Sequence, residues 1–267
     1  MNNLKKFDTY TNLTIYKSQN FISPHVFYDK TTERIHYYMK DYQLLDHISS
    51  TSTGGQYIDL GCKLMENTDD IQIDMKFNFK GHGKTGPQQS TFIASQPETS
   101  PNPGFVCRIA RSEQNGVHAI EFKLKWELNS MSTFYDDPGG NGFPGYYLND
   151  WGQFPVSGGA TSHTKHLTNN VYEETIILDN IPQEQCHNMN TYLFCALNSS
   201  GQPFRFSEVD VYYMRIYKGG TLIRSLWPVR RKSDNVIGLY DIITDYFYTS
   251  QGDEPFIGQE IDGINSN

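Results

Sequence analysis

Two segments of this chain alternate strictly between apolar and polar side chains, and this alternation most restricts what the chain can fold into. Five apolar side chains alternate with four polar ones over residues 71–79 (IQIDMKFNF), and the same pattern recurs over residues 120–128 (IEFKLKWEL). Successive side chains of a β-strand point to opposite faces, so each segment predicts a strand with one buried and one solvent-facing side. Such half-buried strands are typical of antiparallel sheets.

Shorter β-like segments joined by turn-forming residues follow along the chain. Strands predicted at residues 212–218 and 221–226 flank Gly219-Gly220, a connector that tolerates positive φ at both positions and suits a tight hairpin. Pro228 is expected to end the second of these strands, and only residues 40–48 could hold a turn or two of helix. The other short predicted strands are residues 56–60, 91–95, 105–110, 174–178, 192–197, 209–217, 236–242 and 246–249.

The composition agrees with a β-rich globular protein. Aromatic residues reach 14% (18 Tyr, 16 Phe and 3 Trp), while charged residues make up 19%. A disordered chain would lack these aromatic residues, and a coiled coil would be rich in Glu, Lys, Leu and Ala. Many short strands joined by polar turns therefore predict an all-β fold, a two-sheet antiparallel sandwich.

Charge and hydropathy argue against two classes of partner. The formal net charge is −8 and Lys and Arg form no long run, so no nucleic acid partner is expected. No stretch approaches the roughly 18 apolar residues of a membrane span, and the first residues lack the apolar core of a secretory signal. We therefore expect the protein to act where it is made or in a particle assembled there. Cys186 and Cys195 could pair in an oxidising compartment, but free thiols are the favoured interpretation.

Two parts of the chain do not fit a compact sandwich. Residues 1–50 are expected to form an N-terminal arm that pairs with the sandwich or with another subunit. Residues 129–170 form a long insertion with seven glycines, and structureless loops beyond roughly 12–15 residues are uncommon in compact domains. The predicted organisation is an arm (1–50), a sandwich domain (51–258) and a short polar tail (259–267).

Several stretches resemble a known family. The stretches are residues 54–61 (GGQYIDLG), 192–198 (YLFCALN), 216–224 (IYKGGTLIR), 228–241 (PVRRKSDNVIGLYD) and 246–249 (YFYT). They resemble the laminin-G-like, or concanavalin-A-like, jelly-roll domains found in minor structural proteins of tailed phages, including crassvirus-like phages of gut Bacteroides. Residues 23–38 are similar to short N-terminal modules on such phage proteins. The resemblance spans residues 51–257 and implies a jelly-roll topology for the sandwich.

The resemblance implies a non-enzymatic protein of the virion, such as a head fibre, a capsid decoration protein or a tail appendage. The arm would bind capsid or other virion proteins, and the sandwich would project from the particle. Such appendages commonly form homotrimers. An alternative function is a glycan-binding module for host-surface or mucus polysaccharides, and a less favoured one is a polysaccharide hydrolase, because one fold hosts many functions.

The insertion contains the best candidate binding site. Aromatic rings stack on the C–H faces of sugars, and carboxylate oxygens accept hydroxyl protons, so its residues could hold a glycan. The alternative is that they pack the loop onto its own sandwich or onto a neighbouring subunit. The same oxygens could hold calcium, but no spaced acidic signature is present, so no cofactor is expected. The candidate residues are Tyr135, Asp136, Asp137, Tyr146, Tyr147, Asp150 and Trp151.

Catalytic residues are not expected. Glu208 and Asp210 alternate on a predicted strand and share a face, as the acid pair of a glycosidase does, yet solvent-facing polar residues are the favoured interpretation. His163 and His166 lack a third metal ligand at a useful spacing.

Overall fold

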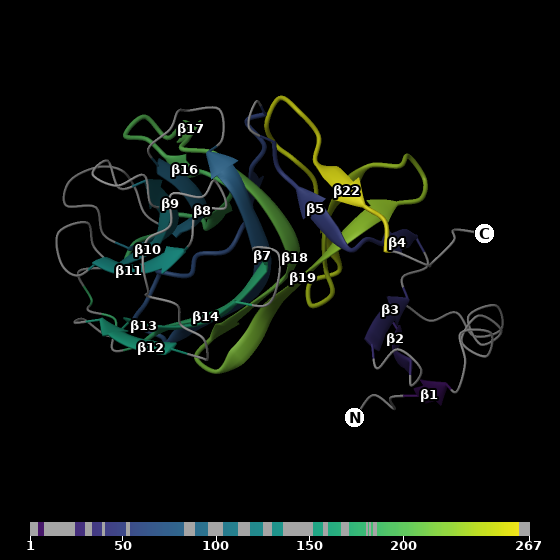
Figure 1. The fold of residues 1–267 in the computed structure, drawn as a ribbon, viewed down its shortest axis with the longest axis horizontal. Helices are drawn as coiled ribbons and strands as arrows, with labels where there is room; N and C mark the ends of the chain where they lie inside the picture. The colour runs from purple at the N-terminus through teal and green to yellow at the C-terminus, as the bar shows by residue number, and fades with distance from the viewer. Residues whose placement is uncertain are drawn as a thin grey trace.

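The computed structural model confirms an all-β fold. Regular elements within the described residues are β-strands, and most of them lie in two antiparallel sheets (Figure 1). In the described part of the chain, no helix is long and apolar enough to span a membrane. The described residues are 5–7, 25–29, 34–38, 41–51, 54–82, 89–95, 104–111, 118–124, 130–135, 152–156, 160–166, 171–179, 181, 183 and 186–261.

The larger sheet has eleven strands within the described residues. Its main path, in spatial order, is β12 (Gly152–Val156), β13 (Ala160–His166), β14 (Val171–Leu178), β7 (Ile71–His82), β18 (Ser207–Lys218), β19 (Thr221–Arg231), β20 (Ile237–Asp241) and β21 (Tyr246–Tyr248). Three short strands join this path from the side, namely β4 (Tyr42–Leu44), β5 (His47–Ser49) and β22 (Ile257–Gln259).

The smaller sheet faces the larger one across the core. Its six described strands run in the order β11 (Ser130–Tyr135), β10 (His118–Leu124), β9 (Phe105–Arg111), β8 (Gln89–Ser95), β15 (Tyr192–Leu193) and β6 (Ile58–Asp59). A separate pair consists of β16 (Ala196–Leu197) and β17 (Pro203–Phe204). Near the N-terminus, β1 (Lys5–Phe7) runs parallel to β2 (His25–Asp29), which pairs with β3 (Arg34–Tyr38). The two facing layers confirm the predicted sandwich, while its assignment as a jelly roll stays a prediction.

The alternating segments form strands as predicted. In β7 the side chains of Ile71, Ile73, Met75 and Phe77 are at most 1% exposed and point into the core, whereas the polar side chains between them are partly exposed. The ring of Phe77 meets Phe92 of β8 with centroids 5.0 Å apart, so the two sheets are in direct contact. The second alternating segment supplies β10 over its first five residues.

The strands β4 and β5 fill a fork in the larger sheet. One edge of β18 pairs with β19 over residues 214–218 and with β5 at Asp210 and Val211. Conversely, β19 pairs with β18 over residues 221–226 and with β4 over residues 229–231. The two long strands therefore diverge, and the β4–β5 segment lies between them, with β22 on the far edge of β5 (Figure 1).

This arrangement excludes the turn or two of helix that residues 40–48 could have held, because β4 and β5 lie there instead. The segment is held by hydrogen bonds that the local sequence does not reveal. The N–H of Leu45 donates to Pro228 (2.9 Å), that of Asp46 to Gln259 (2.8 Å) and that of Ser50 to Val209 (3.0 Å). The last ten residues of the predicted arm are thus paired into the sheet.

Pro228 also departs from expectation, because β19 continues through it to Arg231. Its carbonyl faces the β4–β5 segment, and in an antiparallel strand the backbone nitrogen of the same residue faces the same side. Pro228 lies where the neighbour on that side changes from β18 to β4. A missing N–H is tolerated at such a break in a ladder.

The hairpin at Gly219-Gly220 agrees with the prediction, whereas the insertion differs from it. The Gly219-Gly220 hairpin joins β18 to β19 as predicted, with φ of +53° and +73°. By contrast, the insertion at residues 129–170 is not simply a loop, because it supplies β11 to the smaller sheet and β12 and β13 to the larger one. The four cysteines are free thiols.

Candidate functional site

The predicted glycan site in the insertion falls almost entirely outside the described residues. Tyr135 is the last residue of β11 and is paired with His118 of β10. The other candidates, whose placement is not described, are Asp136, Asp137, Tyr146, Tyr147, Asp150 and Trp151. Their role as a binding site stays a prediction.

A β-bulge in β18 creates a different candidate site on the outer face of the larger sheet. Val211 pairs with Phe77 and Tyr213 pairs with Lys76, so Tyr212 is an additional residue in β18. A bulge places two residues opposite one and turns both toward the same side. Consequently Tyr212 and Tyr213 both lie beside Lys76 on the outer face, while Met214 returns to the core.

The bulge gathers aromatic and cationic side chains from four strands, which we call the aromatic band. Its members are His47 of β5, Lys76 of β7, Tyr212, Tyr213 and Arg215 of β18, and Trp227 of β19.

The members of the aromatic band stack on one another. Tyr213 and Trp227 have ring centroids 5.9 Å apart, and the Arg215 guanidinium lies over both rings at 5.2 and 5.8 Å. At the fork, the His47 and Tyr212 rings are 5.0 Å apart, and the ammonium of Lys76 lies 4.9 Å from the Tyr212 ring centroid. Cation–π contacts at exposed sites contribute only about 0.5–1 kcal/mol, so an incoming ligand could displace these cations.

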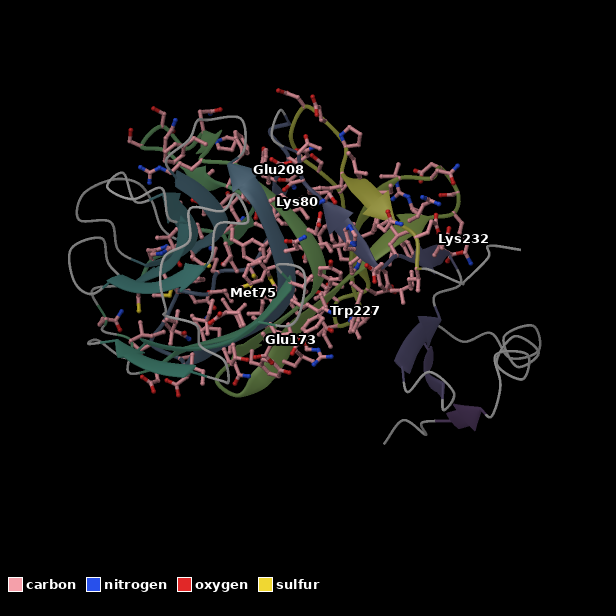
Figure 2. The ribbon with its side chains drawn as sticks, in the orientation of Figure 1. Met75, Lys80, Glu173, Glu208, Trp227 and Lys232 are labelled. Atoms are coloured by element: carbon pink, nitrogen blue, oxygen red, sulfur yellow. The ribbon has the colours of Figure 1, made fainter. Side chains whose placement is uncertain are left out.

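Two cross-strand rows connect members of the aromatic band with the polar side chains beside them. One row runs Thr175, Asp74, Arg215 and Ser225, and the next runs Glu173, Lys76 and Tyr213. Asp74 accepts hydrogen bonds from Thr175 (3.0 Å) and from Gln72 (2.9 Å), which hold its carboxylate in place. The indole N–H of Trp227 donates to the Ser225 hydroxyl at 3.0 Å, which orients the indole ring. Figure 2 marks Glu173 and Trp227 on their strands.

The tyrosines of the aromatic band are neutral at physiological pH. Burial is the main cause that raises the pKa of Tyr212 to about 12, and the carboxylates of Asp210 and Asp46 add to it. Burial likewise raises the pKa of Tyr213 to about 12, helped by Glu173 and opposed by Arg215. Both phenol groups therefore keep their proton and can donate hydrogen bonds.

Asp210, by contrast, is enclosed at the fork. Its carboxylate side chain is only 3% exposed, and Lys80 approaches one oxygen to 2.6 Å. The Ser49 hydroxyl donates to that oxygen, and the Asn78 amide donates to the other at 3.3 Å. A carboxylate needs such partners when it is buried, because an unpaired buried charge is strongly disfavoured. Asp210 thus ties β5 and β7 to β18.

Glu208 lies near Asp210 and Lys80, at the end of the fork (Figure 2). Burial raises the pKa of Glu208, the Asp210 carboxylate raises it further, and Lys80 lowers it. On the predicted shared face, Glu208 is partly exposed, whereas Asp210 is buried and engaged by neighbours from β5 and β7. A glycosidase pair needs both carboxyl groups to reach the substrate, and Asp210 is placed to stabilise the fold instead.

The side chains of the aromatic band are of the kinds that hold ligands by stacking and hydrogen bonding. The aromatic band offers ring faces together with hydrogen-bond donors and acceptors, the combination that small-molecule sites use for affinity and orientation. Burial raises the pKa of the Cys107 and Cys195 thiols, which disfavours a thiolate nucleophile. Among the residues that the structure describes, no group of three or more His, Cys, Asp or Glu side chains could hold a metal ion.

The aromatic band was not predicted from the sequence, although one signal was present. Apolar residues fall at 209, 211, 214 and 216, so the alternation changes phase between Val211 and Met214. Such a phase change predicts a bulge. The predicted hairpin already brings Trp227 beside Tyr213, but His47 could not be assigned to the same surface, because only the pairing at the fork brings β5 near β18.

No protein-family model matches this chain, and no curated protein or solved structure matches it either.

Proposed function

We propose that this chain is a non-enzymatic structural protein of a phage particle. Its N-terminal arm anchors it to the particle, and its sandwich projects outward as a lectin-like domain. The assembled form is a homotrimer. The resemblance of its C-terminal third to jelly-roll domains of tailed-phage structural proteins motivates this proposal. The proposed location is therefore the virion, and the proposed partners of the arm are capsid or other virion proteins.

The attachment of the arm to the sandwich is the observation that carries the proposal. An anchor must transmit force to the domain that it holds. The chain enters the sandwich through β4, which pairs with β19, and β5, which is paired on both sides with β18 and β22. Ile48 is fully buried in the main core, and Tyr42 and Leu44 pack on Val229 and Tyr240. A pull on the arm would therefore have to break several strand pairings at once.

Incorporation into particles tests the anchoring role. A variant that lacks residues 1–40 keeps β4 and β5, so its sandwich should fold while it fails to join the particle. Quantitative mass spectrometry of purified particles, with wild-type chain and a variant lacking residues 262–267 as controls, should show loss of the arm-deleted chain only. Unchanged incorporation of the arm-deleted chain would refute the anchoring role.

A second candidate function, recognition of surface glycans, is favoured by the aromatic band. Tyr213, Trp227 and Arg215 present stacked rings and hydrogen-bond donors on the outer face of the sheet. A sandwich held on a particle by its arm could use such a face to bind host-surface or mucus polysaccharides. Glycan-array binding by the full-length chain tests this function, and absence of binding to any glycan would refute it.

A further inference from the structure

We propose that the aromatic band binds an uncharged pyranose glycan, with one sugar ring on Tyr213 and Trp227. This inference rests on the glycan-binding function proposed above and adds to it the location of the site and the class of sugar. It differs from the site predicted in the insertion, because the residues of the aromatic band lie on β5, β7, β18 and β19.

The aromatic rings supply the surface on which a sugar would stack. Tyr213 and Trp227 lie side by side at 5.9 Å with ring planes tilted by 32°, and both are partly exposed. The indole is fixed by its hydrogen bond to Ser225, and the bulge fixes Tyr213 within the strand ladder. Because both rings are held by a sheet rather than by a loop, little ordering is needed when a sugar binds.

The polar groups around the rings supply both kinds of hydrogen-bond partner. Arg215 and Lys76 carry donors, and Asp74 and Glu173 carry acceptors, all on the same face in two adjacent rows. A sugar hydroxyl donates one hydrogen bond and accepts others, so it needs both kinds of partner at once. The Arg215 guanidinium lies over the two rings, so a sugar that stacks there displaces it from the ring faces and has its donors beside it.

The balance of charge decides the class of sugar. Lys76 and Arg215 contribute two positive charges, and Asp74 and Glu173 contribute two negative charges, so the surroundings of the rings have no net charge. A uronate or sialate that is attracted by Arg215 and Lys76 would also face Asp74 and Glu173, which are their neighbours one strand away, so its charge brings no net attraction. The chain as a whole carries a net charge of −8, which also repels polyanionic polysaccharides at long range. Neutral hexose oligomers are therefore the ligands that this surface fits.

Calorimetric titration of the full-length chain tests the proposal. The probes are glucose, galactose and mannose oligosaccharides, with galacturonate oligosaccharides as the acidic comparison. We expect binding of a neutral oligosaccharide that Trp227→Ala weakens at least about tenfold and that Arg215→Gln also weakens. The control is Tyr246→Ala, which removes an aromatic ring that is 57% exposed and lies outside the aromatic band, and which should leave binding unchanged. Thermal unfolding checks that each variant is folded.

Three outcomes would overturn the proposal, and they separate it from the function on which it rests. Binding of galacturonate oligosaccharides alone would refute the neutral class while keeping glycan recognition. Binding that survives both substitutions but is lost in Trp151→Ala would place the glycan on the insertion. Absence of binding to every probe would refute the site together with glycan recognition, while particle incorporation would still decide the structural role independently.

Discussion

At the residue level, Asp210 connects three strands of the larger sheet through one carboxylate. Ser49 lies on β5, Asn78 and Lys80 lie on β7, and Asp210 itself lies on β18. The sequence favoured a solvent-facing polar residue at this position, with half of an acid pair as the alternative, and the burial of Asp210 shows that the favoured interpretation was wrong. Asp210 stabilises the fold, because its buried carboxylate is held by Ser49, Asn78 and Lys80. A buried charge needs such hydrogen-bond and ionic partners in place of water.

Replacement of Asp210 by alanine is expected to destabilise the fold by about 2–3 kcal/mol, because the Ser49 hydroxyl and the Asn78 amide lose a charged acceptor. Lys80 is 41% exposed and can return to water, which keeps the loss below the about 3–5 kcal/mol typical of broken buried ion pairs. Urea unfolding measures the change. The exposed Asp69→Ala should change stability by less than about 0.5 kcal/mol, and an Asp210→Ala protein as stable as this control would contradict the assigned role.

Glu208 should make stability depend on pH. Because its pKa is raised in the folded chain, the ionised form is disfavoured there, and folding loses stability as the pH rises from about 4.3, the ordinary value for Glu, through the raised pKa. Glu208→Gln removes this loss. We expect the variant to match the wild type below about pH 4 and to be more stable at about pH 7. Unfolding free energies measured across this range test the effect, which a pH-independent difference would exclude.

At the element level, the bulge in β18 determines what the outer face of the larger sheet presents. Without it, Val211 and Tyr213 would lie on one side of the strand and Tyr212 on the other. With it, Val211 and Met214 stay in the core and both tyrosines face outward. One additional residue thus doubles the aromatic surface beside Lys76 without changing the core.

Deletion of single residues tests this account of the bulge. Removal of Tyr212 leaves Val211 opposite Phe77 and Tyr213 opposite Lys76, so the ladder becomes regular and the chain should still fold. Removal of Val211 instead shifts Tyr212 to the core position opposite Phe77, where overpacking costs about 1–3 kcal/mol and the phenol group loses its access to water. Thermal unfolding should show a clearly larger loss for the Val211 deletion. Equal losses would mean that Tyr212 is not the additional residue.

At the level of the whole molecule, the sandwich is completed by strands from both ends of its chain. β4 and β5 come from its N-terminal side and β22 from its C-terminal side, and β5 lies between β18 and β22. The described chain enters the sandwich at Asp41, whose carbonyl accepts a hydrogen bond from the N–H of Lys232 (2.9 Å), and then follows the fork through β4 and β5.

Two truncations should separate the arm from the sandwich. Removal of residues 1–40 leaves every strand of the larger sheet within the described residues, so the melting temperature should change little. Removal of residues 1–51 deletes β4 and β5 and with them the buried Leu45 and Ile48. Loss of two such side chains costs at least about 4 kcal/mol, which corresponds to a fall of about 10 °C or more in the melting temperature. Calorimetry of both proteins measures the difference, and equal melting temperatures would contradict the integral role of β4 and β5.

The sequence alone determined the all-β character, the buried face of β7 and the hairpin at Gly219-Gly220. These features depend on local properties, namely side-chain alternation along one strand and backbone freedom at one turn, and such properties can be read from neighbouring residues. Local sequence was misleading at residues 40–48 and at Pro228. There the conformation is decided by which strand lies alongside.

Only the tertiary structure decided where the candidate site lies. His47, Lys76 and the β18–β19 hairpin are far apart in the chain, and they share one surface because β5 and β7 both pair with β18. The same pairing encloses Asp210 and leaves Tyr213 partly exposed, although both side chains lie on the outer face of one strand. The location of the candidate site and the exposure of these two side chains both depend on strand pairing between distant segments. Burial and charge compensation depend on neighbouring residues that the local sequence does not contain.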